Sequence, residues 1–73
     1  MNMAYRRTLA RRQVVLNLVT GRSFVGVLLR QDGPLLVLVN AQMRENGRTV
    51  DLDGSVVVER SHVEFAQVIG EHA

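Results

Sequence analysis

The sequence predicts a mostly β fold, in which a short N-terminal helix is followed by five strongly bent antiparallel strands that form a small barrel. Residues 14–41 contain three apolar, alternating runs separated by two short turns. Asn46-Gly47 is a strong hairpin signal, because both residues tolerate the positive φ angles of a type I′ turn. The 73 residues allow one domain, 1–73, with the barrel over 14–69.

The N-terminal helix is predicted over residues 3–11. This segment consists of helix formers and contains no glycine or proline, and Tyr5 and Leu9 lie at i and i+4 on one face. A helix this short is not stable alone in water, so we expect it to dock on another surface.

The first three strands follow in order. Val14–Val19 alternates, and Phe24–Arg30 forms a second run in which Gly26 indicates a bend or a close backbone approach. Asp32-Gly33-Pro34 predicts a turn, because Pro34 lacks the N–H that a central strand needs. Leu35–Ala41 is almost wholly apolar, which indicates a strand covered on both faces.

A fourth strand is expected to begin near Arg48, after the hairpin. It continues to Val58 if Asp53-Gly54 is a bulge rather than a second turn. Glu59–Ser61 then forms a tight corner, and Val63–Ile69 is the fifth strand.

Composition restricts the classes of site that the chain can hold. The absence of cysteine excludes disulfides and thiolate metal sites, and His62 and His72 are isolated, so we expect no metal and no cofactor. No apolar run approaches the ~18 residues of a membrane span, and we expect a cytoplasmic protein, or a virion protein if it is a phage component. A domain this small needs extra stability, which association of identical copies would supply.

Catalytic chemistry is not indicated. Asp51 and Asp53 are close in sequence, but neither a histidine or serine partner nor a metal-ligand set accompanies them, and an exposed hairpin explains them better. No phosphate-binding glycine loop is present. We therefore expect no enzyme activity.

The basic residues are concentrated at the N-terminus. Four of the nine arginines, and no acidic residue, lie in the first twelve positions: Arg6, Arg7, Arg11 and Arg12. The other five arginines are outnumbered by seven acidic residues. The planar guanidinium suits phosphate groups. The run predicts either a phosphate-binding surface or a solvated charged face.

The pattern of apolar and glycine positions resembles the Sm-like family, which includes the bacterial Hfq proteins. The resemblance covers about residues 4–69 and implies a ring-forming small barrel. The first family motif is matched at Val14, Leu16, Leu18, Gly21, Phe24, Gly26, Leu28 and Asp32, and the second at Gly54, Val56, Val58, Val63 and Phe65.

The chain departs from this family where a uridine is bound. In eukaryotic and archaeal members a methionine-asparagine pair lies three and four residues past the aspartate, and its asparagine contacts the uracil edge. Leu35 and Leu36 stand there instead. The supporting arginine-glycine pair is replaced by Glu59 and Arg60, and of the lysine-histidine pair of Hfq only His62 is present. The resemblance therefore implies the fold without the uridine pocket.

The last two strands are expected to have unpaired, valine-rich edges that join copies into a homo-oligomeric ring. We expect this ring to be a structural or assembly element with a protein partner; the alternative is an RNA- or nucleic-acid-binding ring. The predicted interface residues are Val56, Val57, Val58, Val63, Phe65 and Val68, and the predicted nucleic-acid contacts are Arg6, Arg7, Arg11, Arg12, Arg60 and His62.

Overall fold

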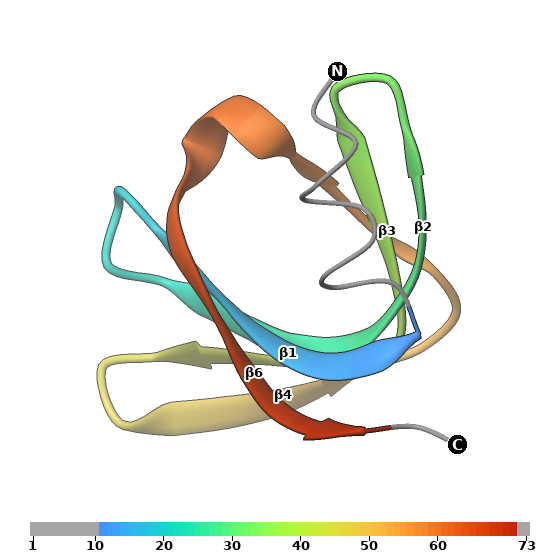
Figure 1. The fold of residues 1–73 in the computed structure, drawn as a ribbon. Helices are drawn as coiled ribbons and strands as arrows, with labels where there is room; N and C mark the ends of the chain where they lie inside the picture. The colour runs from blue at the N-terminus through green and yellow to red at the C-terminus, as the bar shows by residue number, and fades with distance from the viewer. Residues whose placement is uncertain (1–10, 72–73) are drawn as a thin grey trace.

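The computed structural model describes residues 11–71 of the chain, and within them all regular structure is β apart from one 3-10 turn. The strands bend strongly and curl around a common centre (Figure 1). In chain order the elements are β1 (Arg12–Leu18), β2 (Ser23–Asp32), β3 (Leu35–Glu45), β4 (Arg48–Leu52), β5 (Val56–Glu59), the 3-10 turn η1 (Arg60–His62) and β6 (Val63–Glu71).

All strand pairs are antiparallel, and they follow the order β4-β3-β2-β1-β6. The long strand β3 pairs with two strands in succession: its C-terminal part, from Ala41 to Glu45, lies beside β4, and its N-terminal part, from Leu35 to Leu38, lies beside β5. Strand β3 therefore joins both β4 and β5 to the rest of the sheet.

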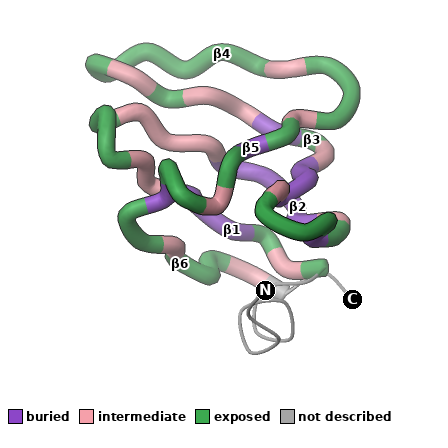
Figure 2. The backbone as a smooth tube through the Cα atoms, turned by 90° about the horizontal axis from the view of Figure 1, so that it is seen from above, coloured by how far each residue is buried: buried purple, intermediate pink, exposed green. Residues whose placement is uncertain are grey.

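The core comes from the alternation that the sequence displays. Val14, Leu16, Leu28, Leu36 and Leu38 are completely buried and belong to one cluster. Buried residues gather in β1, β2 and β3, whereas β4 is exposed along most of its length (Figure 2). The prediction that β3 is covered on both faces is confirmed, because the intervening Val37 is also buried.

The sheet bends where β2 approaches β3 most closely. The pairs Val25–Gln42 and Val27–Val39 leave Gly26 opposite two residues of β3, which is a β-bulge. A Cβ atom on Gly26 would lie 3.0 Å from the Val39 carbonyl oxygen and 3.1 Å from the Ala41 Cα. The predicted close approach at Gly26 is confirmed.

The predicted turns are also confirmed. Gly33 and Pro34 join β2 to β3, and Gly33 has a φ of 56°. Asn46 and Gly47 join β3 to β4 with φ angles of 52° and 75°, as the type I′ hairpin requires.

The expectation of five strands is wrong, because the fourth one is interrupted. The segment 53–55 is not a bulge in a continuous strand but a break, with a φ of 72° at Gly54. The partner strand β3 bends at Asn40, whose φ is 51°, and a single straight strand cannot follow it. Pairing therefore ends at Leu52 and resumes at Val56, giving six strands in the described chain.

The N-terminal helix predicted over 3–11 lies outside the described residues except for its last position. Arg11 has a φ of 61°, so this residue is not helical. Its backbone N–H donates to the carbonyl oxygen of Leu28, 2.6 Å away, which ties the start of β1 to β2.

Candidate functional site

Three strands of the part of the chain that the structure describes pair on one side only, namely β4, β5 and β6, and the last two carry the predicted interface residues. Within residues 11–71, β5 pairs only with β3, and β6 pairs only with β1. Each strand therefore has one edge of N–H and C=O groups that no neighbouring strand of the described chain covers. Such edges are templates for pairing with another chain.

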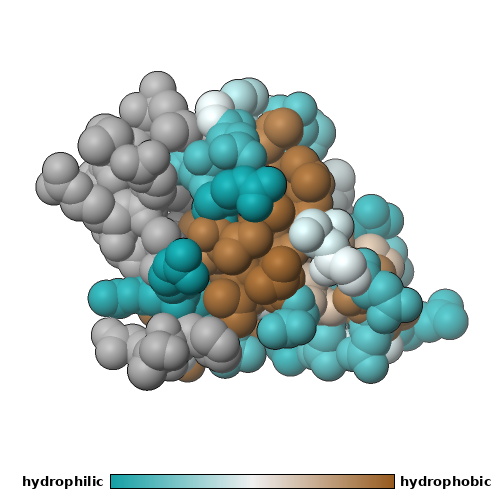
Figure 3. All heavy atoms as spheres, turned by 90° about the vertical axis from the view of Figure 1, so that its right-hand side faces the viewer, coloured by the Kyte–Doolittle hydropathy of each residue, from teal (hydrophilic) through white to brown (hydrophobic). Residues whose placement is uncertain are grey.

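Large apolar side chains accompany these edges. Val57 of β5 is 56% exposed, and Phe65, Val68 and Ile69 of β6 are 53%, 40% and 50% exposed. The side of the molecule that carries β2 and β3 also shows a continuous apolar area, with polar residues above and below it (Figure 3). Strand β5 pairs with β3. Both edges therefore offer hydrophobic area as well as hydrogen-bonding groups.

The six predicted interface residues differ in where their side chains lie. Val57, Phe65 and Val68 are exposed. Val58 and Val63 are 5% and 7% exposed and belong to the subunit's own core, against which Val56 also packs. The side chains of these three valines are therefore committed to the core, and at an edge they can contribute only their backbone groups.

Ile69 is an exposed apolar residue of β6 that the predicted interface set does not contain. The register between β1 and β6 shifts there: Gln13 pairs with Gly70 and Val14 pairs with Val68, so Ile69 has no partner on β1. A register shift of this kind depends on the tertiary pairing and has no sequence signal of its own.

The corner at which the family binds uridine is assembled in this chain, but with different side chains. The N–H of Arg60 donates to the carbonyl oxygen of Pro34 at 2.7 Å, which holds η1 against the β2–β3 turn. Leu36 is completely buried in the core, and Glu59 is exposed. At the positions of the family motif, this corner thus has a buried leucine and an exposed carboxylate in place of the amide and the arginine.

One ion pair and one side-chain hydrogen bond lie at the β2–β3 turn of this corner. Arg30 donates from Nε to Asp32 Oδ2 at 2.8 Å, and Gln31 donates from Nε2 to the carbonyl oxygen of Gly33 at 3.2 Å. The turn is therefore stabilised by the Gln31 side chain, while the Asp32 carboxylate pairs with an arginine of the same strand.

The predicted nucleic-acid residues that the structure describes lie in two places, at the start of β1 and in η1. Arg6 and Arg7 lie outside the described residues. Arg11 and Arg12 lie at the start of β1, whereas the carbonyl oxygen of His62 accepts from the N–H of Val19, just beyond the other end of that strand. Strand β1 has seven residues. Arg60 and His62 lie together in η1, next to the far end of this strand, whereas Arg11 and Arg12 lie at its start.

Among residues 11–71, no group of three or more histidine, cysteine, aspartate or glutamate side chains is arranged to hold a metal ion. The same part of the chain contains no helix long and apolar enough to cross a membrane.

Comparison with known proteins connects this geometry to a fold. The sequence matches no protein-family model and no curated protein. The structure, however, superimposes on that of the Pyrococcus abyssii Sm protein in complex with a uridine heptamer, with a TM-score of 0.79, 23% identity, and coverage of 94% of this chain and 99% of that chain.

Two other solved structures are similar. A heptameric archaeal Sm protein gives a TM-score of 0.77 with 24% identity over 90% of this chain and 97% of that one. A chain of the NatC complex bound to CoA gives a TM-score of 0.74 with 22% identity, over 86% of this chain and 82% of that one. Together with the matched glycine and apolar positions, these likenesses establish that the chain has the Sm-like fold.

Proposed function

We propose that copies of this chain assemble into a closed homo-oligomeric ring, in which β5 of one subunit pairs with β6 of the next, and that the ring is a non-enzymatic structural or assembly element. The observation that carries this proposal is the pair of uncovered edges, each accompanied by exposed apolar side chains such as Val57 and Phe65.

A ring accounts for both edges at once. A head-to-tail contact uses a different surface on each side of the subunit, and repeated contacts either close into a ring or continue as a filament. Closure pairs the uncovered edges of β5 and β6 in every subunit and so avoids the aggregation that these exposed valine-rich strands promote. Solved neighbours with the same fold, the P.aerophilum SmAP1 heptamer and the archaeal Sm heptamer, support closure.

The corner between the β2–β3 turn and η1 supports an assembly role over uridine recognition. Leu36 is buried, and Glu59 adds a negative charge where the family has arginine. Such a ring would present its faces to a protein partner rather than to a uridine-rich strand.

Native mass spectrometry tests the assembly directly. The proposal predicts a single dominant species with one fixed copy number at micromolar concentration, and a protein partner rather than RNA in material purified from cells. A monomer, or a continuous series of copy numbers, would overturn the ring.

A second candidate is a nucleic-acid-binding ring, which the neighbour in complex with a uridine heptamer favours. In this case the contacts are those of Arg6, Arg7, Arg11 and Arg12. If all four arginines neutralise phosphates of a single strand, raising the salt concentration from about 50 to 200 mM should weaken binding about 50-fold.

Fluorescence anisotropy with a labelled uridine heptamer distinguishes the two roles. The nucleic-acid role predicts the stated salt dependence, and replacement of the four arginines by alanine should abolish binding. Absence of binding at 50 mM salt would eliminate this role and leave the assembly role.

A further inference from the structure

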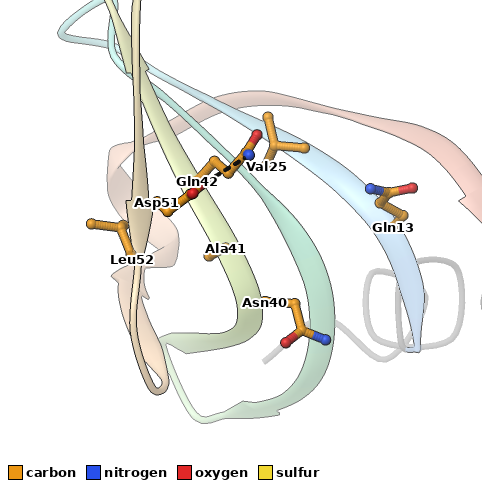
Figure 4. A pocket seen from close by; sticks show the side chains of 7 residues that line it. All are labelled: Gln13, Val25, Asn40, Ala41, Gln42, Asp51 and Leu52. Carbon is orange, nitrogen blue, oxygen red and sulfur yellow. Dashed lines mark hydrogen bonds between the residues drawn. The ribbon is translucent and has the colours of Figure 1, made fainter.

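A cavity of about 330 Å³ lies on the subunit surface over β1, β2, β3 and β4, away from the corner described above. Four uncharged or acidic polar side chains line it: Gln13, Asn40, Gln42 and Asp51 (Figure 4). Apolar atoms of Val25, Ala41 and Leu52 complete the lining. The volume lies at the lower end of the range of about 300–1,000 Å³ that small-molecule sites occupy.

The bulge at Gly26 adjoins the cavity. Two residues of β3, Asn40 and Ala41, stand opposite this glycine, and Asn40 has a φ of 51°. Asn40 and Gln42 are two residues apart on β3, and both line the cavity, as expected for alternate residues of one strand. Ala41, which lies between them in the sequence, also contributes to the lining.

The hydrogen-bonding groups of the cavity are partly fixed. Gln42 donates from Nε2 to Asp51 Oδ1 at 2.8 Å, which orients both side chains across the β3–β4 pair. The second carboxylate oxygen of Asp51 and the carbonyl oxygen of Gln42 remain as acceptors. The side chains that line the cavity include no arginine.

We propose that this cavity binds a guanine base. The guanine edge presents a ring N–H beside an exocyclic amino group, and a carboxylate such as that of Asp51 accepts from both. The amide groups of Gln13 and Asn40 can donate to the guanine carbonyl oxygen. Uracil presents a single N–H between two carbonyl oxygens, which the carboxylate repels. The apolar atoms of Val25, Ala41 and Leu52 offer a surface for a planar ring.

A nearby arginine could bind the phosphate group of a guanine nucleotide. Arg44 is exposed and lies two residues after Gln42 on β3, so both side chains project from the same face. A guanine nucleotide and a guanine within RNA share this chemistry. The proposal goes beyond ring assembly and does not require it, since one subunit supplies every residue named.

Titration of the ¹⁵N-labelled full chain with guanosine monophosphate and uridine monophosphate tests the site by NMR. We expect the guanine nucleotide to shift the side-chain amides of Asn40 and Gln42 and to bind at least tenfold more tightly than the uridine nucleotide. Equal affinity for the two, or no shift with either at millimolar concentration, would overturn the proposal.

Two variants locate the binding. Asp51→Asn should weaken binding of guanosine monophosphate at least tenfold, while Asp53→Asn, with the same change of charge just outside the strand, should not. Asn40→Gly removes the amide yet suits the positive φ, so it should fold normally and weaken binding at least threefold. If the Asp51 and Asp53 variants bind alike, or Asn40→Gly binds like the native chain, the site is not this cavity.

Two heptanucleotides, UUUGUUU and UUUUUUU, separate the sources of the base. If the guanine-containing heptamer binds with the same affinity as guanosine monophosphate, the cavity is a site for a free nucleotide. If the heptamer binds at least tenfold more tightly than guanosine monophosphate, the cavity is a site for guanine in RNA. Either result supports the cavity. Equal binding of both heptamers, unaffected by Asp51→Asn, would contradict it.

Discussion

The substitution Phe65→Ala tests the edge of β6. Phe65 pairs with Asn17 of β1, and its side chain is 53% exposed in the single subunit. In the proposed ring this exposed half would be buried against the neighbouring subunit. Its truncation should therefore weaken the contact between subunits.

The magnitude follows from the area. A phenylalanine side chain buries about 150–250 Å² in full, so its exposed half corresponds to roughly 75–125 Å². At about 25 cal/mol per Å², truncation costs about 2–3 kcal/mol for each contact between subunits. This free energy corresponds to an association about 30- to 140-fold weaker. Removal of one subunit from a closed ring breaks two contacts, so the loss is doubled there.

A dilution series by mass photometry or light scattering after size exclusion measures the effect. The Phe65→Ala ring should dissociate at a much higher protein concentration than the native ring. Val19→Ala is the matched control, because Val19 is 64% exposed but lies in the turn after β1 and not on β5 or β6. Identical dissociation of native and Phe65→Ala rings, with circular dichroism showing both folded, would refute the reasoning.

Three further substitutions test the fold by urea unfolding. Gly26→Ala should lower the free energy of unfolding by about 1–3 kcal/mol, because its Cβ would lie 3.0–3.1 Å from atoms of β3. The Cβ of Gly33→Ala meets no atom within 4 Å, so this substitution should lower the free energy of unfolding only by the ~1 kcal/mol of a left-handed backbone. A larger loss for Gly33→Ala than for Gly26→Ala would contradict the bulge. Gln31→Met should change the free energy of unfolding by about 1 kcal/mol or less, because it removes one hydrogen bond together with a buried oxygen that has no partner. Gln31→Glu should lower the free energy of unfolding by several kcal/mol at pH 7, because it buries a charge. Equal effects of the two substitutions would mean that this site is not apolar. Arg30→Ala should cost about 1 kcal/mol or less, because its ion pair with Asp32 is exposed to solvent, and a larger loss would show that the pair stabilises the turn more than surface pairs do.

The positions of most strands and turns along the sequence could be predicted from local patterns. Alternation identified the strands around Leu16, Leu28 and Leu38, because inward residues at every second position make the core. The turns at Gly33 and at Asn46-Gly47 followed from residues that accept a positive φ. Each of these features depends on neighbours in the sequence.

The features that could not be predicted depend on the partner strand. The break between β4 and β5 follows from the bend of β3 at Asn40, whereas the local pattern at Asp53-Gly54 is compatible with either a bulge or a turn. The inward orientation of Val58 and Val63 follows from their strand register, although the valine run looks uniform. The cavity at Asp51 needs four strands and a bulge, so the sequence alone indicated only an exposed hairpin.

Backbone hydrogen exchange in the assembled protein tests the central claim most directly. If β5 and β6 pair between subunits, the amides along both strands should be protected as strongly as those of the central strand β2. Strand β4 is an internal reference, because within the described chain it pairs on one side only and should keep fast-exchanging amides at alternate positions. The same alternating fast exchange along β5 and β6 would contradict the ring.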